Sequence, residues 1–330
     1  MRIYIIRRLL LAIPTVFLVS LGIFFMVRLI PGSIVDTMVA ECIETGTFMP
    51  EEVRATIEHN LGLDVPIFQQ YGRWVGVWPQ EDGSFSGILQ GNLGKSLWRK
   101  IPVAKEIALG WPITLELGIM SLIIAQLIAL PIGIYSALRQ DTWGDYIGRS
   151  FAITCIAVPG FWLGTMVMVF PSIWWGYTPS IFLIPFTEDP IGNLKMFIVP
   201  AIVLGMALSG ITMRMTRSMM LEVLRQDYIR TAWAKGLRER VVVMRHALKN
   251  ALIPVITIVG LQMPVLIGGS VIIEQIFCLP GVGRLILEAV IQRDYTLVSG
   301  LLILFSVAMV LINLVVDIAY AYLDPRVHYK

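Results

Sequence analysis

Apolar residues are gathered into six long segments, separated by short polar stretches and one long one. They run at about 9–30, 113–138, 150–176, 196–213, 250–273 and 297–322. A segment of roughly 20 apolar residues is long enough to cross a bilayer, and it must be helical because lipid offers its backbone no hydrogen-bond partners. The shortest segment, 196–213, is expected to continue past Arg214. The pattern predicts an all-α integral membrane protein with six transmembrane helices.

Composition supports this class. Of the 330 residues, 56% are hydrophobic and 15% are charged, and the mean hydropathy is +0.75; soluble domains are about 45 to 50% apolar. The chain has room for one membrane domain and one sizeable loop, and an additional soluble enzyme domain would not fit. Arg2, Arg7 and Arg8 precede the first apolar segment, which is longer than the core of a signal peptide. We therefore expect it to be retained as a span.

The positions of Lys and Arg predict the orientation. Placing the N-terminus inside gives the short cytoplasmic pieces 16 Lys and Arg, against three in the short outer loops, Lys195, Arg284 and Arg293. Short cytoplasmic loops carry the excess of positive charge, so both termini are predicted to be cytoplasmic. The predicted parts are a cytoplasmic end with the first helix (1–30), an outer loop (31–106), a five-helix core (107–322) and a cytoplasmic tail (323–330).

The outer loop carries two local patterns. Residues 50–62 have the spacing of a short amphipathic helix, and an aromatic stripe follows it, suited either to anchoring at the membrane interface or to contact with an external partner: Phe68, Tyr71, Trp74, Val75 and Trp78. Gly94-Lys95-Ser96 resembles the end of a phosphate-binding loop, but the first glycine of that motif is replaced by Leu89. Nucleotide binding is therefore not expected here.

The three cysteines are too scattered to predict a metal site or a disulfide scaffold. Cys42 and Cys278 both fall outside on the predicted topology, so a disulfide between them is open, although two free thiols are expected. Cys155 lies within a span and can join neither.

Polar residues inside the spans are candidates for a pathway or for contacts between helices: Glu116, Gln126, Gln262, Asn313 and Asp317. Glu116 and Asp317 lie near the ends of their spans, where they can reach the interface or pair with a basic side chain. Gln262, beside Pro264 and before Gly268 and Gly269, has a composition that can break a helix at mid-membrane and free backbone groups for a substrate. Pathway lining and packing between helices are both open for it. The spans contain no paired acids and no Ser/Lys constellation at matching depths, so an enzyme that acts within the membrane is not predicted.

The stretch 214–254 is a charged island with nine basic and three acidic residues. Within it, Asp227 is predicted to cap a helix that begins at Tyr228 and stops at Gly236. One side of this helix is expected to carry Tyr228, Ile229, Ala232, Trp233 and Gly236, and the other Arg230, Thr231, Ala234, Lys235 and Arg238. A positive-inside anchor or a patch for anionic lipids would also explain the charge. Small residues at Thr231, Ala232 and Ala234 instead favour the close approach of a partner.

Several motifs together resemble those of the inner-membrane permease subunits of ATP-binding-cassette (ABC) importers, in the dipeptide, oligopeptide and nickel branch. The likeness covers nearly the whole chain: Arg7-Arg8-Leu9, Leu29-Ile30-Pro31-Gly32, Leu61-Gly62-Leu63-Asp64, Gln70-Tyr71, Gly91-Asn92-Leu93-Gly94, Arg230-Thr231-Ala232 with Gly236, Arg245 to Pro254, Val271 to Gly283 and Tyr322-Leu323-Asp324-Pro325-Arg326. The general family has Glu-Ala-Ala where this chain has Arg230-Thr231-Ala232, and residues 41–48 and 78–86 look like insertions.

The resemblance implies a type I ABC importer transmembrane domain with an extended first extracytoplasmic loop, in the inner membrane of a bacterium or archaeon. It implies a permease for peptides; nickel chelates or glutathione-like solutes are alternatives, and a self-sufficient secondary transporter is a further one. Implied partners are a paralogous second permease, two cytoplasmic ATPases, an extracytoplasmic substrate-binding protein and membrane lipid, with no nucleic acid. The chain itself would be non-catalytic and need no cofactor, because the partner ATPases would hydrolyse ATP.

The resemblance also assigns roles to residues. The coupling loop would be 214–249, and the residues that contact an ATPase would be Asp227, Tyr228, Arg230, Thr231, Ala232, Ala234, Lys235 and Gly236. Independently of the resemblance, the composition around Gln262, Gly268 and Gly269 makes these three the candidates for lining the pathway.

Overall fold

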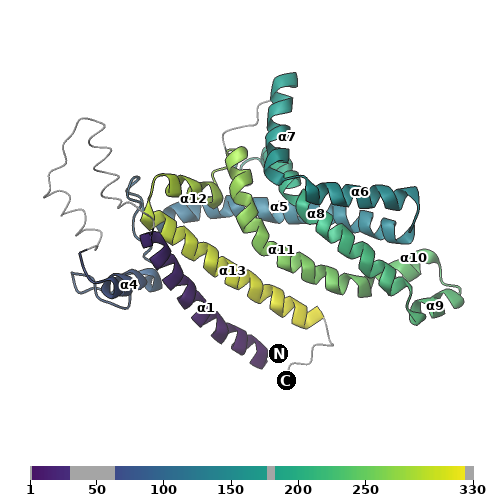
Figure 1. The fold of residues 1–330 in the computed structure, drawn as a ribbon, viewed down its shortest axis with the longest axis horizontal. Helices are drawn as coiled ribbons and strands as arrows, with labels where there is room; N and C mark the ends of the chain where they lie inside the picture. Colours follow the sequence, from purple (N-terminus) through teal and green to yellow (C-terminus); the bar gives the residue numbers. More distant parts are fainter. Residues whose placement is uncertain (1, 30–63, 177–182, 324–330) are drawn as a thin grey trace. The chain divides into compact units, whose positions relative to one another are not determined.

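The computed structural model describes residues 2–29, 64–176 and 183–323, and these are almost entirely helical (Figure 1). The α-helices are α1 (Arg2–Leu29), α4 (Ile67–Val75), α5 (Val103–Leu138), α6 (Trp143–Ala157), α7 (Gly160–Trp175), α8 (Pro190–Leu224), α9 (Asp227–Ala234), α10 (Glu239–Val241), α11 (Leu248–Ile276), α12 (Val282–Ile291) and α13 (Tyr295–Leu323). A 3-10 turn covers Ile88–Gln90, and a π-helical turn, Val242–Ala247, leads into α11. The predicted helix at 50–62 and Cys42 lie outside the described residues.

Five helices in the described part are long and apolar enough to cross a membrane, and the bent pair α6 and α7 makes a sixth span if it is counted as one. The class predicted from the apolar segments is therefore confirmed. The segment expected at 196–213 does extend past Arg214, because α8 has 35 residues and ends at Leu224.

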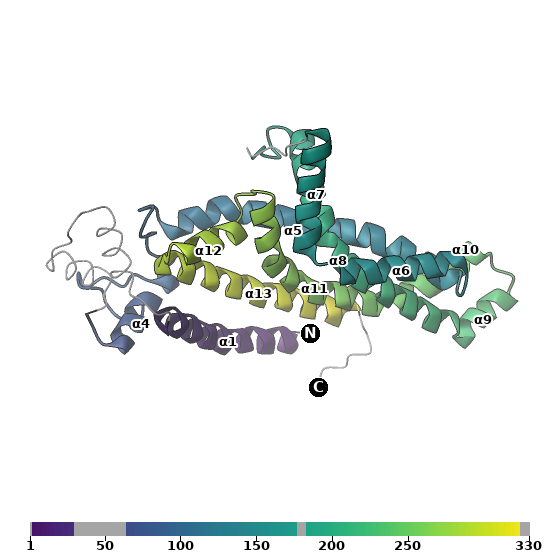
Figure 2. The same ribbon diagram turned by 45° about the horizontal axis from the view of Figure 1, so that its top comes forward.

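The segment expected at 150–176 as one helix is two helices. α6 and α7 are bent by 94° at a break of two residues, and α7 points away from α6 in both ribbon views (Figures 1 and 2). Val158 is extended, with φ −79° and ψ 120°. Pro159, which follows it, has no backbone N–H and disfavours the helical conformation in the residue before it. The apolar composition continues through the break, so hydropathy alone does not reveal it.

The chain divides into two compact units. The first unit comprises residues 1–9, 111–284 and 311–330, and α8 is at its centre, packed against α6, α7 and α11. Small residues allow this approach: a Cβ on Gly205 would lie 2.6 Å from the Ser121 carbonyl oxygen, and one on Gly210 would lie 2.7 Å from that of Ala152. Main-chain contacts this close between helices are typical of membrane bundles.

The second unit comprises residues 10–110 and 285–310. In it, α4 packs on the C-terminal half of α1 through aromatic rings. Tyr71 lies edge-on to Phe24 with ring centroids 5.2 Å apart, and its hydroxyl hydrogen-bonds the Ser20 hydroxyl at 2.7 Å. The predicted aromatic stripe is therefore divided: Tyr71 and Trp74 pack inward, while Phe68 and Trp78 are exposed.

Candidate functional site

The predicted helix in the charged island is present as α9. It begins one residue earlier than expected, and Gln226 rather than Asp227 is its N-cap; the Asp227 side chain instead accepts a weak 3.4 Å hydrogen bond from Arg230. Asp227 is already in the first helical turn, so its carboxylate cannot take the cap position. The predicted stop is confirmed: Gly236 has φ +74°, and the N–H of Leu237 bonds back to the Ala232 carbonyl. Glycine is favoured at this left-handed C-terminal position.

One face of α9 packs against the ends of three long helices. Ile229 is fully buried and Ala232 is 6% exposed, in a core shared with Ala137 of α5, Met220 of α8 and Ala251 of α11. Val242, Val243 and Ala247 of the π-helical turn complete this core. Ala232, which we expected to leave room for a partner, is thus used within the chain. Because the packing joins α9 to three long helices, a force applied to α9 acts on all of them.

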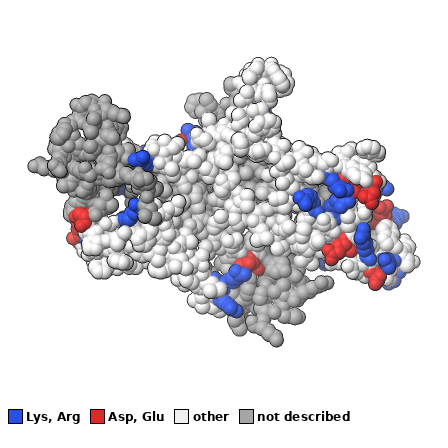
Figure 3. Space-filling model, in the orientation of Figure 1, with Lys and Arg blue, Asp and Glu red and all other residues white. Residues whose placement is uncertain are grey.

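The other face of α9 is exposed and charged. Asp227, Tyr228, Arg230, Thr231, Ala234, Lys235 and Gly236 are all open to solvent. Figure 3 shows blue and red side chains gathered at the end of the molecule where Figure 1 places α9 and α10. Asn250, at the start of α11, donates a 2.8 Å hydrogen bond to the Tyr228 hydroxyl. This face can receive a partner while its orientation is set by the core behind it.

A buried ion pair joins α6 to α8. Asp145 is fully buried, and it accepts hydrogen bonds from Arg217 Nε and Nη2, both at 2.7 Å. The Asp141 backbone N–H donates to the same carboxylate at 3.0 Å, and the Ser136 hydroxyl donates as well. Sequence reasoning treated Arg217 only as one charge in the island. Its partner lies 72 positions earlier, which no local pattern connects.

The predicted pathway residues lie on α11, which runs without a break through Pro254 and Pro264. Gln262 is 5% exposed and lies against α8, with Thr212 Oγ1 and the Leu208 carbonyl oxygen each 3.4 Å from its side chain. Gly269 faces Leu204 of α8, and Gly268 has open space around it. The helix break that this composition could produce is absent, since α11 continues through both prolines; membrane helices tolerate proline where neighbouring helices pack against them.

The other polar residues of the spans have separate environments. Asp317 pairs with Arg8 at 2.9 Å, as its position near the end of a span allows. Gln126 has a buried side-chain amide with no hydrogen-bond partner among the described residues. Asn313 is exposed.

A polar cluster that the sequence did not predict lies at the C-terminal end of α11. Glu274 is fully buried; it accepts from Thr114 Oγ1 at 2.7 Å and from the Arg284 backbone N–H at 2.9 Å. Gly281 approaches the same carboxylate so closely that a Cβ there would lie 2.3 Å from Glu274 Oε2. The only local signal was an acidic residue at the end of an apolar segment, followed by Pro-Gly-x-Gly.

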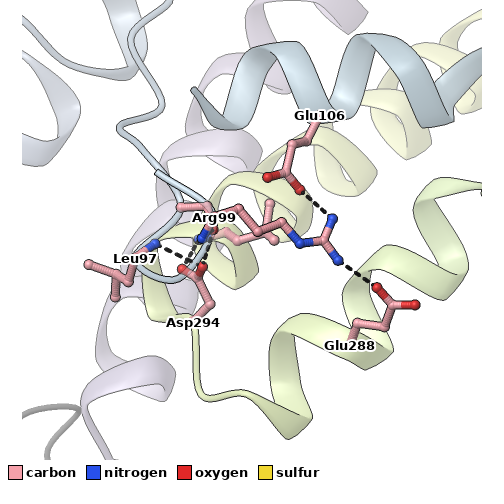
Figure 4. A network of polar contacts seen from close by, with 7 residues as sticks. Leu97, Arg99, Glu106, Glu288 and Asp294 are labelled. Atoms are coloured by element: carbon pink, nitrogen blue, oxygen red, sulfur yellow. Dashed lines mark hydrogen bonds and ion pairs between the residues drawn. The ribbon is translucent and has the colours of Figure 1, made fainter. Parts of the chain in front are cut away.

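A second missed network lies in the second unit (Figure 4). Arg99 bridges two carboxylates, Glu106 at 3.1 Å and Glu288 at 2.6 Å. Asp294 accepts from Ser96 Oγ at 2.6 Å and from the Leu97 backbone N–H at 2.9 Å. The bonds to Glu288 and Asp294 tie residues 96–99 to α12 and to the segment between α12 and α13, across 189 to 198 positions.

Comparisons with known proteins identify the family. Residues 129–329 match the model of the binding-protein-dependent transport system inner membrane component, and residues 1–118 match the model of the N-terminal part of such a membrane component. The chain belongs to this family. The resemblance to permease subunits of ABC importers in the peptide branch is thereby confirmed.

Relatives match over almost their whole length. The chain is 37% identical to the glutathione transport system permease protein GsiC of Salmonella paratyphi A over 99% of both proteins. It is 38% identical to a putative peptide transport system permease protein of Brucella suis over 98% of both. A crystal structure of an amino acid ABC transporter with histidines matches with a TM-score of 0.52 at 13% identity, over 66% of this chain and 94% of that one; this likeness concerns the fold.

Membership makes the chain a multi-pass inner-membrane permease that works with ATPase and substrate-binding partners. Among the described residues, no group of three or more His, Cys, Asp and Glu side chains is placed to hold a metal ion. Cys155 and Cys278 are free thiols.

Proposed function

We propose that this permease forms half of the translocation pathway of an ATP-driven importer for peptides, and that α9 with Lys235 and Gly236 docks into a cytoplasmic ATPase. A paralogous permease would supply the other half, two ATPases would hydrolyse the ATP, and an extracytoplasmic binding protein would deliver the substrate. Both termini and α9 would lie on the cytoplasmic side. The pathway would be lined in part by Gln262, Gly268 and Gly269 of α11.

The observation that carries this proposal is the construction of α9. Its apolar face is part of the same core as α5, α8 and α11, and its charged face is open. ATP-driven closure of an ATPase pair would move α9 as a rigid body and bias the spans between two states. A patch that served only to hold lipid or to fix topology would need no such connection.

The substrate class rests on the relatives. Proteins named as peptide and as glutathione permeases match at 37 to 38% identity. Glutathione is itself a small peptide-like anion, so both names favour a peptide-type solute over a nickel chelate. Membership in a binding-protein-dependent family favours ATP-driven import over a self-sufficient secondary transporter.

The test changes the exposed face of α9 and leaves its buried face intact. Lys235→Glu reverses a charge there, and Gly236→Pro removes the positive φ that ends the helix. The full complex, with its ATPases and binding protein, should lose at least 10-fold of its ATP-dependent uptake in both variants, while the amount of permease in the membrane stays normal. Ala232→Arg should also abolish uptake, but Ala232 is buried, so this variant tests the core as well.

Arg139→Glu is the matched control, since it reverses one exposed charge in the turn between α5 and α6 outside α9. It should keep most of the uptake. Unchanged uptake in Lys235→Glu and Gly236→Pro would exclude α9 as the coupling element. Identifying the solute retained by the co-purified binding protein would test the substrate class separately.

A further inference from the structure

A small cavity beside the Asp145–Arg217 pair has three arginines among its lining residues. It has a volume of about 20 Å³ and lies between α5, α6 and α8 of the first unit. Gly133 and Gly148 form part of its wall, and Arg149, Arg214 and Arg217 are among its lining residues.

The three arginines have different environments. Arg217 is held by both oxygens of Asp145, whose remaining hydrogen-bonding capacity is taken by Ser136 and the Asp141 N–H. Arg149 and Arg214 are exposed, and neither has a carboxylate within ion-pair distance among the described residues. Two exposed guanidinium groups beside the cavity are therefore without a carboxylate partner among the described residues. No acidic group remains there to bind a cationic amine.

The lengths of the helices around the cavity are consistent with a position at the depth of lipid headgroups. α5 and α8 have 36 and 35 residues, and at 1.5 Å per residue each is more than 50 Å long, against about 30 Å for the hydrocarbon core. Their ends therefore project beyond the hydrocarbon. Gly133 is five residues, or roughly 8 Å, before the end of α5. Trp143 and Tyr146, exposed on the first turns of α6, are residue types enriched at the membrane interface.

Exposed apolar side chains lie on the same two helices, α6 and α8. Ile147 and Phe151 of α6 and Ile211 of α8 are exposed on the surface of the first unit. A molecule with a phosphate at the arginines would have this surface available for its acyl chains. A free phosphate ion would make no use of it.

We propose that Arg149, Arg214 and Arg217 bind the phosphate of an anionic phospholipid. Guanidinium groups match phosphate oxygens in a bidentate manner, and basic pockets between transmembrane helices are a recognised place for such headgroups. Asp145 acts by holding Arg217 in place. Naming this leaflet as cytoplasmic rests on the proposed function, but the binding itself does not. Because α8 leads directly into α9, the lipid is bound to the helix that carries the coupling element.

The test is a lipid titration of the purified complex in detergent, followed by native mass spectrometry. Phosphatidylglycerol is the probe and phosphatidylcholine is its zwitterionic control. Arg149→Gln combined with Arg214→Gln should weaken phosphatidylglycerol binding by roughly 30-fold, the effect of losing two charges at a membrane surface. Arg149→Lys with Arg214→Lys keeps both charges but loses the bidentate match, so it should weaken phosphatidylglycerol binding by less than the glutamine pair does.

Arg238→Gln with Arg240→Gln removes two exposed charges from the adjacent loop and should leave phosphatidylglycerol binding unchanged. Four results would overturn the proposal. The first is that phosphatidylglycerol binding persists in the Arg149/Arg214 glutamine variant, and the second is that both glutamine pairs lose binding equally. The third is that millimolar inorganic phosphate displaces the lipid completely. The fourth is that the Arg149/Arg214 glutamine variant loses the second permease while it keeps the lipid. The last result would assign the arginines to a protein interface. Since none of these readouts is transport, the proposal can fail independently of the proposed function.

Discussion

At the scale of single residues, burial separates ion pairs that matter for folding from pairs that do not. Asp145 is fully buried and receives two short hydrogen bonds from Arg217. Asp227 and Arg230 form a 3.4 Å pair on the surface, with side chains 94% and 74% exposed. Removing one partner of a buried pair leaves an uncompensated charge in a low-dielectric site, whereas an exposed pair contributes little because water and salt screen it.

Asp145→Asn should therefore destabilise the protein strongly, by about 3 to 5 kcal/mol, as expected for breaking a buried pair. Thermal unfolding of the detergent-solubilised complex, together with the amount of protein in the membrane, measures the effect. Asp227→Asn is the matched control and should change neither quantity. Equal stability of the two variants would show that Arg217 is solvated when Asp145 is neutral, and would contradict the role given to the pair.

The same scale shows what the sequence could predict. Gly236 was predictable because a glycine after an amphipathic stretch commonly ends a helix, and its φ of +74° agrees. The bridge from Arg99 to Glu106 and Glu288 was not predictable, because its ion pair with Glu288 joins residues 189 positions apart. Such pairs follow from the packing of helices, which a single sequence does not specify.

At the scale of elements, hydropathy predicted where helices lie more reliably than where they turn. The 3.6-residue period places Ile229 and Ala232 on one side of α9, and both are buried, but Tyr228 and Trp233 on the same predicted side are exposed. The bend at Val158–Pro159 interrupts an apolar segment without changing its composition. Pro159 was a visible signal, but Pro112, Pro131 and Pro200 lie inside unbroken helices, so proline alone does not distinguish a bend from a straight span.

The attachment of α4 can be tested with two aromatic residues of the same helix. Tyr71 packs on Phe17 and Phe24 and hydrogen-bonds Ser20, while Phe68 is 82% exposed. Tyr71→Ala should cost about 2 kcal/mol of local stability through lost apolar contact and one hydrogen bond. The amides of α4 should then exchange roughly 30-fold faster in hydrogen-exchange mass spectrometry.

Phe68→Ala removes an aromatic ring from the same helix without removing a contact to α1, and should leave the exchange of α4 unchanged. Should Phe68→Ala accelerate exchange as much as Tyr71→Ala does, α4 would be held by its exposed face, in lipid or against a partner. The exposed face of α4 would then hold the helix in place, which is what the aromatic stripe predicts.

At the scale of the whole molecule, the remaining expectation is which side of the membrane each end occupies. The excess of Lys and Arg predicts that α9, α10 and both termini are cytoplasmic, and the coupling proposal needs that orientation. The chain contains suitable reporters. Cys278, just beyond α11, is exposed and free, whereas Cys155 is buried in α6. Cys42 is also predicted to be external, so a Cys42→Ser background removes its contribution.

In that background, a membrane-impermeant maleimide added to spheroplasts should label Cys278 and leave Cys155 unlabelled. Arg240→Cys, which places an exposed thiol in α10, should be labelled only after the membrane is opened, because the permease would hold α10 on the cytoplasmic side. Labelling of Arg240→Cys in intact spheroplasts would invert the topology and remove α9 from the reach of any cytoplasmic ATPase. Cys155 reports on integrity in both arms, since its labelling would indicate unfolding rather than orientation. The charge bias thus makes one testable prediction. The helix α9, which shares a core with α5, α8 and α11, must face the compartment that contains ATP.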